Sequence, residues 1–546
     1  MIENHLLSLL IFLPLLAGAI ILFIPQKNAS LYKWVALLAM TIELVLTLVL
    51  VKNFDQSLPG IGNEALQFVE KMNWIDLQIG STTSISIQYF LGVDGLSITM
   101  ILLSAIVLLV GVISSWNIKE NGKGYWVLYL ILSASVVGCF VALDFFLFYL
   151  FFEFMLLPMY FLIGMWGGKR REYASIKFFL YTLVGSILIL IVMIALSISV
   201  IQPNPVMDVH SFDLMLMMDN SNFIKDSVLS ISSTDSLFGL SYRLWGFLLI
   251  LIGFAIKLPA VPVHTWLPDA HVEAPTPISV VLAGILLKIG GYGFYRIAYS
   301  IFPEGAYYFG WWIGLFGIIA IVYGALVAMA QSDLKRLIAY SSVSHMGFVM
   351  LGLAAITFQS AAGSMFQMFS HGLISAALFL IAGVIYDRTK DRQISSYSGL
   401  ATGMPYFSVV VLIAFFASLG LPGFSGFIAE FLILAGSFEG AIKSEVISVF
   451  MPILGVVGLV LGAAYFLWTL QRMFFGKYWV RDEEWKMPDL TKRELLMFVP
   501  LLVMIFVFGI FPGLILDLSN ETIISFVELV TQQGKENLQI ILQNVK

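Results

Sequence analysis

Six ionisable residues stand inside long apolar runs of this sequence. A charge near the middle of a membrane costs roughly 2.5 to 3.5 kcal/mol even on a lenient insertion scale, so each of them needs an explanation. Titratable groups in a row can pass protons to one another through water, and a proton relay is the chemistry that they suit. They are Glu153 in "FFEFMLLP", Lys257 in "GFAIKLPAVP", Lys288 in "AGILLKIGGYG", His345 in "SSVSHMGFV", His371 in "QMFSHGLIS" and Glu430 in "GFSGFIAEFLIL".

Each residue, taken alone, also has a purely structural interpretation. Any of the six can be a satisfied polar group or half of an ion pair that joins two helices, and a single buried histidine most often is. Six of them on separate spans favour a relay. Metal binding by the histidines is disfavoured, because no His-x-x-x-His or carboxylate pair has ligand spacing. The single cysteine, Cys139, excludes a disulfide framework, an iron-sulfur cluster and a cysteine zinc site, and we expect it to be buried.

Composition indicates which elements must position these residues. The chain has 546 residues, 60% hydrophobic and 12% charged, with a mean hydropathy of +0.94. These values are typical of an integral membrane protein, and its long apolar runs predict helices of roughly 20 residues across about 30 Å of hydrocarbon. We predict an all-α polytopic fold with fourteen spans, near residues 6–24, 31–51, 89–116, 125–143, 145–166, 174–201, 244–270, 276–299, 306–330, 336–354, 363–385, 406–437, 448–475 and 494–517.

The distribution of basic residues predicts the orientation. Nineteen Lys and Arg lie in or beside the connections that face away from the termini, and seven lie on the terminus side. Lys257, Lys288 and Arg296 fall within spans. By the positive-inside rule both termini are then outside the cytoplasm. The first apolar run has no basic leader and no small-residue cleavage site, so we expect it to be a retained span.

Two spans are interrupted at matching places. The seventh breaks at "KLPAVP", near residues 258–262, and the twelfth at "SLGLPGFSG", residues 418–426. Each is the fourth span of a five-span block, and blocks with an odd number of spans are inverted relative to each other. Paired breaks in inverted repeats point to a transport pathway, although two prolines could also merely kink two helices.

This pattern predicts one membrane domain in four parts. They are a three-helix segment with an external loop (1–124), two five-helix repeats (125–299 and 306–475), and a last span with a short interfacial tail (494–546). The external connections near 52–88 and 202–242 either cover the outer surface and touch partners or are plain linkers.

Glu153 and Lys257 could act as a unit. Burial disfavours the charged form of a lysine, and a carboxylate about 7 Å away restores roughly 2.4 kcal/mol at an effective dielectric of about 20. Moving the carboxylate nearer to the lysine would therefore favour its protonated form, and moving it away would favour release of the proton. Backbone freed by Pro259 and Pro262 admits water beside it. His264 and His271, in the same stretch, either line an entrance or simply cap and pack.

Several motifs carry a family resemblance over essentially the whole chain. "FFEFMLLPMYFLIGMWG", "FAIKLPAVPVHTWLPDAHVEAPTPISVVLAGILLKIGGYG", "SDLKRLIAYSSVSHMGFV", "SHGLISAALFLIAG" and "GLPGFSGFIAEF" resemble the antiporter-like proton-pumping subunits of respiratory NADH:quinone oxidoreductase, complex I. The resemblance implies pumping elements at Glu153, Lys257, Lys288 and Glu430, with His345 and His371 as connecting histidines. Glutamate at the Glu430 position, and the lack of a long lateral helix, resemble the M branch (chain 4 in mitochondria) rather than its L and N siblings.

The resemblance also implies a setting. We expect a bacterial inner membrane with both termini on the periplasmic side, L-like and N-like subunits as neighbours, and no nucleic acid partner. NADH, FMN, iron-sulfur clusters and quinone would be bound by partner subunits. This chain would hold no cofactor or metal, since it has no Rossmann glycine motif, cluster cysteines or phosphate loop.

Three functions stay open on the sequence alone. The first is a proton-translocating subunit that takes protons from the cytoplasm through spans four to eight, passes them from Lys257 through Lys288 and the histidines, and releases them near Glu430. The second is a subunit of a multi-subunit Na⁺/H⁺ antiporter. The third is a non-conducting scaffold whose polar residues only join helices. The first is favoured, because an ionisable residue inside a membrane is a functional site by default.

Overall fold

Helices dominate the computed structural model, which describes residues 5–79, 83–118, 120–203, 208–443 and 446–544. Lys119 and Lys546, which the count of basic residues includes, lie outside the described residues. The larger helices are α1 (Leu6–Phe23), α2 (Ser30–Lys52), α3 (Gly95–Ser114), α4 (Gly122–Val141), α5 (Phe145–Phe154), α6 (Leu156–Trp166), α7 (Arg171–Ser199), α9 (Tyr242–Lys257), α10 (Trp266–Glu273), α11 (Thr276–Val281), α12 (Leu287–Gly293), α13 (Pro303–Met329), α14 (Leu334–Ala355), α15 (Phe358–Thr389), α17 (Pro405–Ser418), α18 (Ser425–Lys443), α19 (Phe450–Phe474), α20 (Lys492–Ile510) and α21 (Gly513–Asn544).

Shorter elements lie in the connections. They are α8 (Leu214–Met217), α16 (Leu400–Gly403), β1 (Gln67–Ile79), β2 (Thr83–Val93), β3 (Ile201–Gln202), β4 (Asp208–Ser211), β5 (Ser236–Leu237), β6 (Leu240–Ser241), β7 (Tyr397–Ser398) and β8 (Trp479–Val480). Two π-helical segments, Leu282–Leu286 and Phe294–Tyr299, flank α12.

The described residues contain 13 helical stretches long and apolar enough to cross a membrane. Twelve of these stretches match whole predicted spans. The other one, Ser425–Lys443, matches the second half of the span predicted at 406–437. The seventh span is missing from this set because it consists of two short pieces, α9 and α10, separated by non-helical residues 258–265. The twelfth is likewise divided into α17 and α18. The all-α polytopic fold is therefore confirmed, while the inversion of the repeats stays a prediction.

The third span begins later than predicted. Residues 83–93, which the sequence placed partly in the span that starts at 89, form β2 and pair antiparallel with β1. The helix begins only at Gly95, because the Asp94 carboxylate accepts hydrogen bonds from the backbone N–H groups of Leu96 and Ser97. The strand escaped detection because its apolar residues run on into the helix without a polar boundary.

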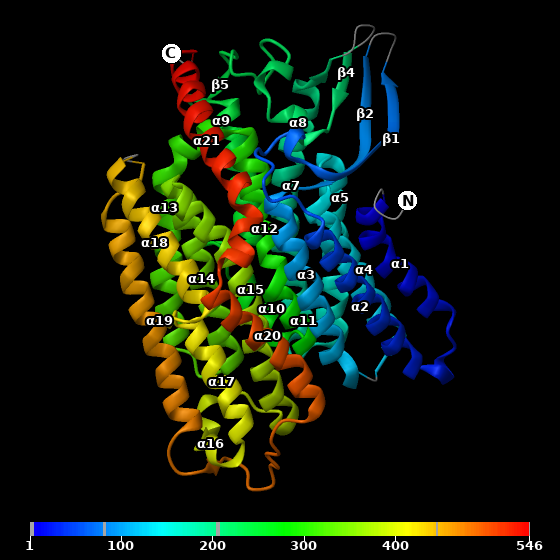
Figure 1. Cartoon of the computed structure of the whole chain (residues 1–546), viewed down its shortest axis with the longest axis vertical. Helices are drawn as coiled ribbons and strands as arrows, with labels where there is room; N and C mark the ends of the chain where they lie inside the picture. The colour runs from blue at the N-terminus through cyan, green and yellow to red at the C-terminus, as the bar shows by residue number, and fades with distance from the viewer. Residues whose placement is uncertain (1–4, 80–82, 119, 204–207, 444–445, 545–546) are drawn as a thin grey trace.

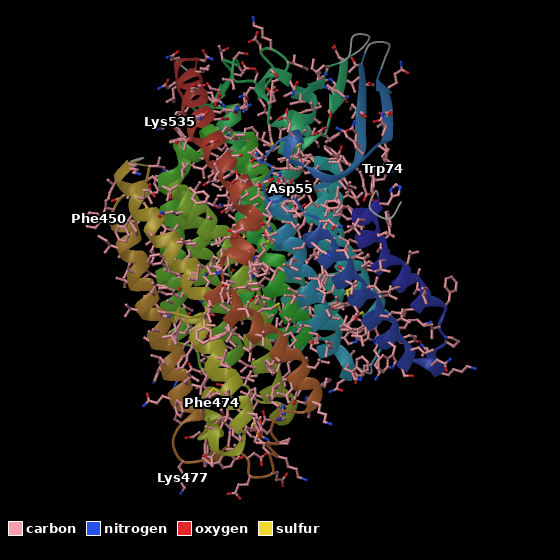
Figure 2. The ribbon with its side chains drawn as sticks, in the orientation of Figure 1. Asp55, Trp74, Phe450, Phe474, Lys477 and Lys535 are labelled. Atoms are coloured by element: carbon pink, nitrogen blue, oxygen red, sulfur yellow. The ribbon has the colours of Figure 1, made fainter. Side chains whose placement is uncertain are left out.

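The two long connections near 52–88 and 202–242 form a sheet and are not plain linkers. Its strand order is β1-β2-β4-β3, with β2 and β4 parallel, so that residues far apart in the sequence pair. Figure 1 shows the β1–β2 hairpin projecting from the same end of the molecule as the C-terminus. Glu70 on β1 accepts hydrogen bonds from the Leu7 and Ser8 N–H groups and so caps α1. In Figure 2, Trp74 on this hairpin and Lys477 mark opposite ends of the molecule.

The end of the chain differs from the prediction as well. The last span, predicted to reach 517, ends at Ile510, and a new helix of 32 residues, α21, begins at Gly513. Its buried stripe includes Ile523, Phe526 and Val530, and it packs against α3, α13 and α15. The chain therefore ends in a long helix packed on protein, and not in the short tail that we expected.

Candidate functional site

Four of the six predicted site residues form a connected chain in the centre of the molecule. Lys288 Nζ lies 2.8 Å from His371 Nδ1, and the rings of His371 and His345 are 5.5 Å apart between centroids. His345 Nδ1 lies 3.1 Å from Glu430 Oε1. All four residues are at most 8% exposed. The four residues lie on different helices: α14, α15, α18 and the span that contains α12. The fold thus brings together residues spread over positions 288 to 430.

A π-helical segment positions Lys288. The segment Leu282–Leu286 widens the helix just before the lysine, and Lys288 Nζ donates to the carbonyl of Ala283 inside it. Single π-helical turns are rare and occur often at functional sites. The carbonyl and His371 Nδ1 together orient a lysine whose entire span is buried in the protein.

The break between α17 and α18 positions Glu430. Gly420 in the break has φ +75°, and a Cβ at this position would lie 2.5 Å from Glu430 Oε2, so the turn fits closely against the carboxylate. Ser418, the last residue of α17, lies 3.3 Å from His345 Nε2. Two cavities of about 10 Å³ border His345 and Glu430, each with room for about one water molecule.

Glu153 and Lys257 form no ion pair within the described residues. Lys257, at the end of α9, is 2% exposed, and its Nζ has no hydrogen-bond partner among them; it lies 4.9 Å from the ring centroid of Phe152. Glu153, the next residue on α5, interacts electrostatically with the lysine. The break beyond Lys257 is held by Trp266, whose Nε1 donates to the Ile256 carbonyl. The predicted pair is therefore near but not in contact.

The two uncertain histidines are packed against rings. His264 lies 5.3 Å from the ring centroid of Tyr323, and His271 stacks on Phe379 at 4.3 Å. Neither has a hydrogen-bond partner for its ring nitrogens among the described residues. His271 also interacts electrostatically with both Lys288 and Lys335.

A cavity of about 460 Å³ opens at the end of the molecule opposite the β1–β2 hairpin. Ser114, Trp166, Glu273 and Lys335 are among its lining residues. Lys335 is 4% exposed and its Nζ donates to the Ala274 carbonyl. Nearby ion pairs hold the ends of helices together, among them Lys177–Asp269 at 2.7 Å and Arg388–Glu494 at 2.9 Å.

Sequence reasoning missed several polar residues around the relay. Gln367 Nε2 lies 3.5 Å from His345 Nδ1, and Tyr465 lines the cavity beside Glu430. Ser370 donates to Ser425 at 2.7 Å, which ties α15 to the start of α18. Ser418 and Ser425 flank the predicted break, and that position could have identified them. Gln367 and Tyr465 sit in apolar or mixed helices where the sequence offers no such clue.

Among the described residues, no group of three or more His, Cys, Asp and Glu side chains could hold a metal ion. Cys139 is free and buried. Nitrogen and oxygen atoms of the relay face one another instead, an arrangement that suits proton exchange.

The fold and this row of titratable groups define a polytopic membrane protein of the ion-translocating type. The family described as "NADH:quinone oxidoreductase/Mrp antiporter, TM" matches residues 142–462. The chain is 41% identical over 532 residues to NADH-quinone oxidoreductase subunit M of Rhodobacter capsulatus, which covers 96% of this chain and 97% of that protein. The chain therefore belongs to the subunit M branch of this family.

Solved structures share the fold. A chain of respiratory complex I from Thermus thermophilus with bound NADH has a TM-score of 0.75 and 28% identity, covering 96% of this chain and 99% of that one. A chain of the Mrp complex from Dietzia sp. DQ12-45-1b has a TM-score of 0.79 at 20% identity, covering 99% of this chain and 100% of that one. The second likeness concerns the fold alone.

Proposed function

We propose that this chain is a proton-translocating membrane subunit of an NADH:quinone oxidoreductase, with Lys288, His371, His345 and Glu430 as its relay. The observation that carries the proposal is the contact chain from Lys288 Nζ to Glu430 Oε1, in which each step is a hydrogen bond or a pair of adjacent rings. Lysine, imidazole and carboxylate can each hold and release a proton, and the two small cavities leave room for water between them.

Glu153 and Lys257 supply the switchable input in this proposal. Among the described residues, Lys257 Nζ has no hydrogen-bond partner that fixes its charge, and Glu153 interacts with it electrostatically without an ion pair. A small movement of α5 relative to α9 would therefore change how strongly the lysine holds its proton. Protons pass from there to Lys288, along the relay, and leave beyond Glu430.

The energy for this movement comes from redox chemistry in other subunits. The proposal places NADH, FMN, iron-sulfur clusters and quinone in those partners, and L-like and N-like subunits beside this chain. It also places the chain in a bacterial inner membrane with its termini on the periplasmic side, as the positive-inside count supports. The name of the Rhodobacter relative supports the assignment to this enzyme.

Exchange of Na⁺ for H⁺ is the second candidate, favoured by the fold shared with the Mrp complex. Glu430 argues against it, because its one paired oxygen faces a histidine nitrogen rather than the several oxygen ligands that a hard cation prefers. The identity of copurifying subunits decides between the two: flavin and iron-sulfur subunits support the redox pump.

The relay is tested by Glu430→Gln in membranes that contain the assembled complex. NADH-driven proton pumping should fall by roughly 10²-fold, since a positioned acid–base group contributes about that much. Glu439→Gln is the matched control: Glu439 lies on the same helix, and its side chain pairs with Lys443 at the surface. Unchanged pumping per assembled complex in Glu430→Gln would mean that the residue only joins helices.

A further inference from the structure

The far end of α10, the second piece of the broken seventh span, is held by cations from the second predicted repeat (306–475). The carbonyl of Val272 accepts a hydrogen bond from Arg392 Nη1 at 2.6 Å, and that of Ala274 accepts one from Lys335 Nζ at 2.6 Å. Carbonyls at the end of a helix have no partner within it, and the helix dipole favours cations there. All four residues line the large cavity. Although α10 belongs to the first predicted repeat, the second one therefore holds its end.

Asp269, about one turn before this end, joins α10 to one helix of each predicted repeat. Its Oδ2 pairs with Lys177 Nζ on α7 at 2.7 Å, and its Oδ1 pairs with Arg336 Nη2 on α14 at 3.3 Å. A second contact with α7 is the 2.9 Å hydrogen bond between the hydroxyls of Thr265 and Tyr181. Both partners of this contact lie four residues from those of the first, so α7 and α10 are joined at two places one turn apart.

The same part of α7 reaches Lys257. Phe178, which follows Lys177, has its ring centroid 5.8 Å from Lys257 Nζ, within the range of a cation–π contact. Its ring also lies 5.3 Å from that of Trp266, the first residue of α10, between centroids. Trp266 is buried, and its Nε1 donates to the carbonyl of Ile256, next to the lysine. Phe178 and Trp266 therefore form a buried aromatic cover between Lys257 and α10.

Side contacts must determine where α10 lies. It has only 8 residues, and non-helical residues 258–265 separate it from α9. A helix shorter than about 12 residues is marginal by itself, and most of its stability comes from tertiary packing. Helices α7 and α14 both pack against α10. The carboxylate of Asp269 is the one group described above that bonds to both of these helices at once.

We propose that Asp269 is a positioning residue that holds α10 between α7 and α14, and so keeps Lys257 covered by Phe178 and Trp266. Because cations of the second predicted repeat bind α10, a movement of α14 carries α10 with it and opens the way from the large cavity to the lysine. The inference rests on the proposed function for the role of Lys257, and it adds what controls access to that residue.

A thiol at position 257 reports this access directly. The variant Lys257→Cys would be combined with Cys139→Ala, which removes the single cysteine of the chain. The assembled complex, in sealed vesicles with the large cavity facing outward, would be treated with a membrane-impermeant trimethylammonium methanethiosulfonate. The thiolate sulfur bonds to the reagent's sulfur and displaces methanesulfinate, which leaves a mixed disulfide. Mass spectrometry of this subunit gives the rate of modification.

Asp269→Asn in this background should raise the rate several-fold, because both ion pairs of the carboxylate are lost. Arg336→Gln removes one of the two pairs and should raise it less. Asp269→Glu keeps a carboxylate and should restore the slow rate. Glu494→Gln is the matched control, because Glu494 pairs with Arg388 at 2.9 Å at the same end of the molecule, and neither residue bonds to α10. Its rate should equal that of the background.

An unchanged rate in both Asp269→Asn and Arg336→Gln would overturn the proposal. An equal rise in Glu494→Gln would overturn it as well, because the effect would then be a general loosening of the helix ends. The side chain of Arg336 is 39% exposed, so that its variant should assemble even where Asp269→Asn does not. The thiol assay does not measure pumping, so normal pumping by Lys257→Met would remove the proposed function and leave the result on access as it stands.

Discussion

Lys257 and Lys288 are both buried lysines, yet their Nζ atoms have different surroundings. Lys288 bonds to a carbonyl and to His371, whereas Lys257 lies over an aromatic ring with no hydrogen-bond partner among the described residues. A buried, unpaired charge contributes nothing to stability and is often improved by an apolar residue of similar shape. The two positions should therefore respond differently to the same substitution.

Lys257→Met should leave assembly at or above the wild-type level, because it replaces an unpaired charge with an apolar chain of similar length. Proton pumping per assembled complex should fall roughly tenfold or more, since the proposed input proton site is lost. Blue-native gels and NADH-driven quenching of a pH dye give the two quantities. A variant that pumps normally would exclude Lys257 from the pathway.

Asp144 lies between two spans, and its protonation couples to folding. Burial raises the pKa of Asp144 from 3.8 to about 7, and the neighbouring Asp213 adds to the shift. Between these values the folded form keeps a proton that the unfolded form has released. The stabilisation is complete below about pH 4 and is lost as the pH rises to about 7.

Asp144→Asn should remove this pH dependence. An asparagine oxygen can still accept from the Leu147 N–H and cap α5, but it does not titrate. The free energy of unfolding should fall between pH 4 and 7 in the wild type and stay level in the variant, as measured by thermal unfolding of the purified protein in detergent. Parallel curves for the two proteins would contradict the assignment.

Single residues of the proposed relay and an order for them could be predicted, but the contacts between their atoms could not. A charge in an apolar run stands out in any sequence, which is why Lys288, His345 and Glu430 were found. Lys288 contacts His371 and not Lys257, because of the way α12 packs against α15. The spacing of residues along the chain does not reveal that packing. Gln367 and Tyr465 were missed for a related reason. Uncharged polar side chains are common in helices, so nothing in the sequence marked these two as neighbours of His345 and Glu430.

At the scale of elements, the two breaks and the π-helical segments do the positioning. The break between α17 and α18 brings Gly420 against Glu430, and the break after α9 ends the helix at Lys257. Proline and glycine residues in the sequence predicted the two breaks. The π-helical segment at Leu282–Leu286 was not predictable, because "LAGIL" would continue an ordinary α-helix equally well.

Gly420→Ala should disturb the proposed relay through contact with Glu430, although it replaces none of the relay residues. Alanine at φ +75° costs roughly 1 to 2 kcal/mol, and its Cβ would lie 2.5 Å from Glu430 Oε2 and displace the carboxylate. Pumping should fall several-fold while NADH oxidation by the assembled complex falls less. Gly423, also at positive φ but with nothing near its Cβ, provides the control variant Gly423→Ala, which shares the strain but not the contact.

At the scale of the whole molecule, one buried ion pair joins the loop before α9 to three helices. Arg243 at the start of α9 pairs with Glu304 at the start of α13 at 2.5 Å, and it also donates to the carbonyl of Leu229 in the loop. Asn537 on α21 donates to the other oxygen of Glu304 at 3.2 Å. The contact thus adds a polar attachment to the apolar packing of α21 on α13.

Glu304→Gln should destabilise the protein by roughly 3 to 5 kcal/mol, because it leaves the Arg243 charge buried and without a carboxylate. Asn537→Ala should cost only about 1 kcal/mol, the usual loss for one hydrogen bond. The comparison is made by thermal unfolding in detergent, with limited proteolysis to report whether α21 detaches first. Equal losses in the two variants would mean that the pair is not the main attachment.

The global arrangement was only partly predictable. Hydropathy located the spans because each must fill the membrane thickness. It could not show that the outer connections pair as one sheet, since β2 meets β4 across more than 100 residues of sequence. It also could not show that the last apolar stripe covers α3 and α13, because a stripe that faces lipid has the same spacing as one that faces protein.

The position of α21 has a consequence for how the chain is made. Its residues 513–544 are synthesised long after α3, yet they cover α3 and form the Asn537–Glu304 hydrogen bond. While earlier spans are already inserted, the surface of α3 and α13 beneath α21 is open to lipid or to assembly factors. A ribosome stalled before residue 513 should therefore leave a bundle whose α3 is accessible to crosslinkers that the released protein excludes.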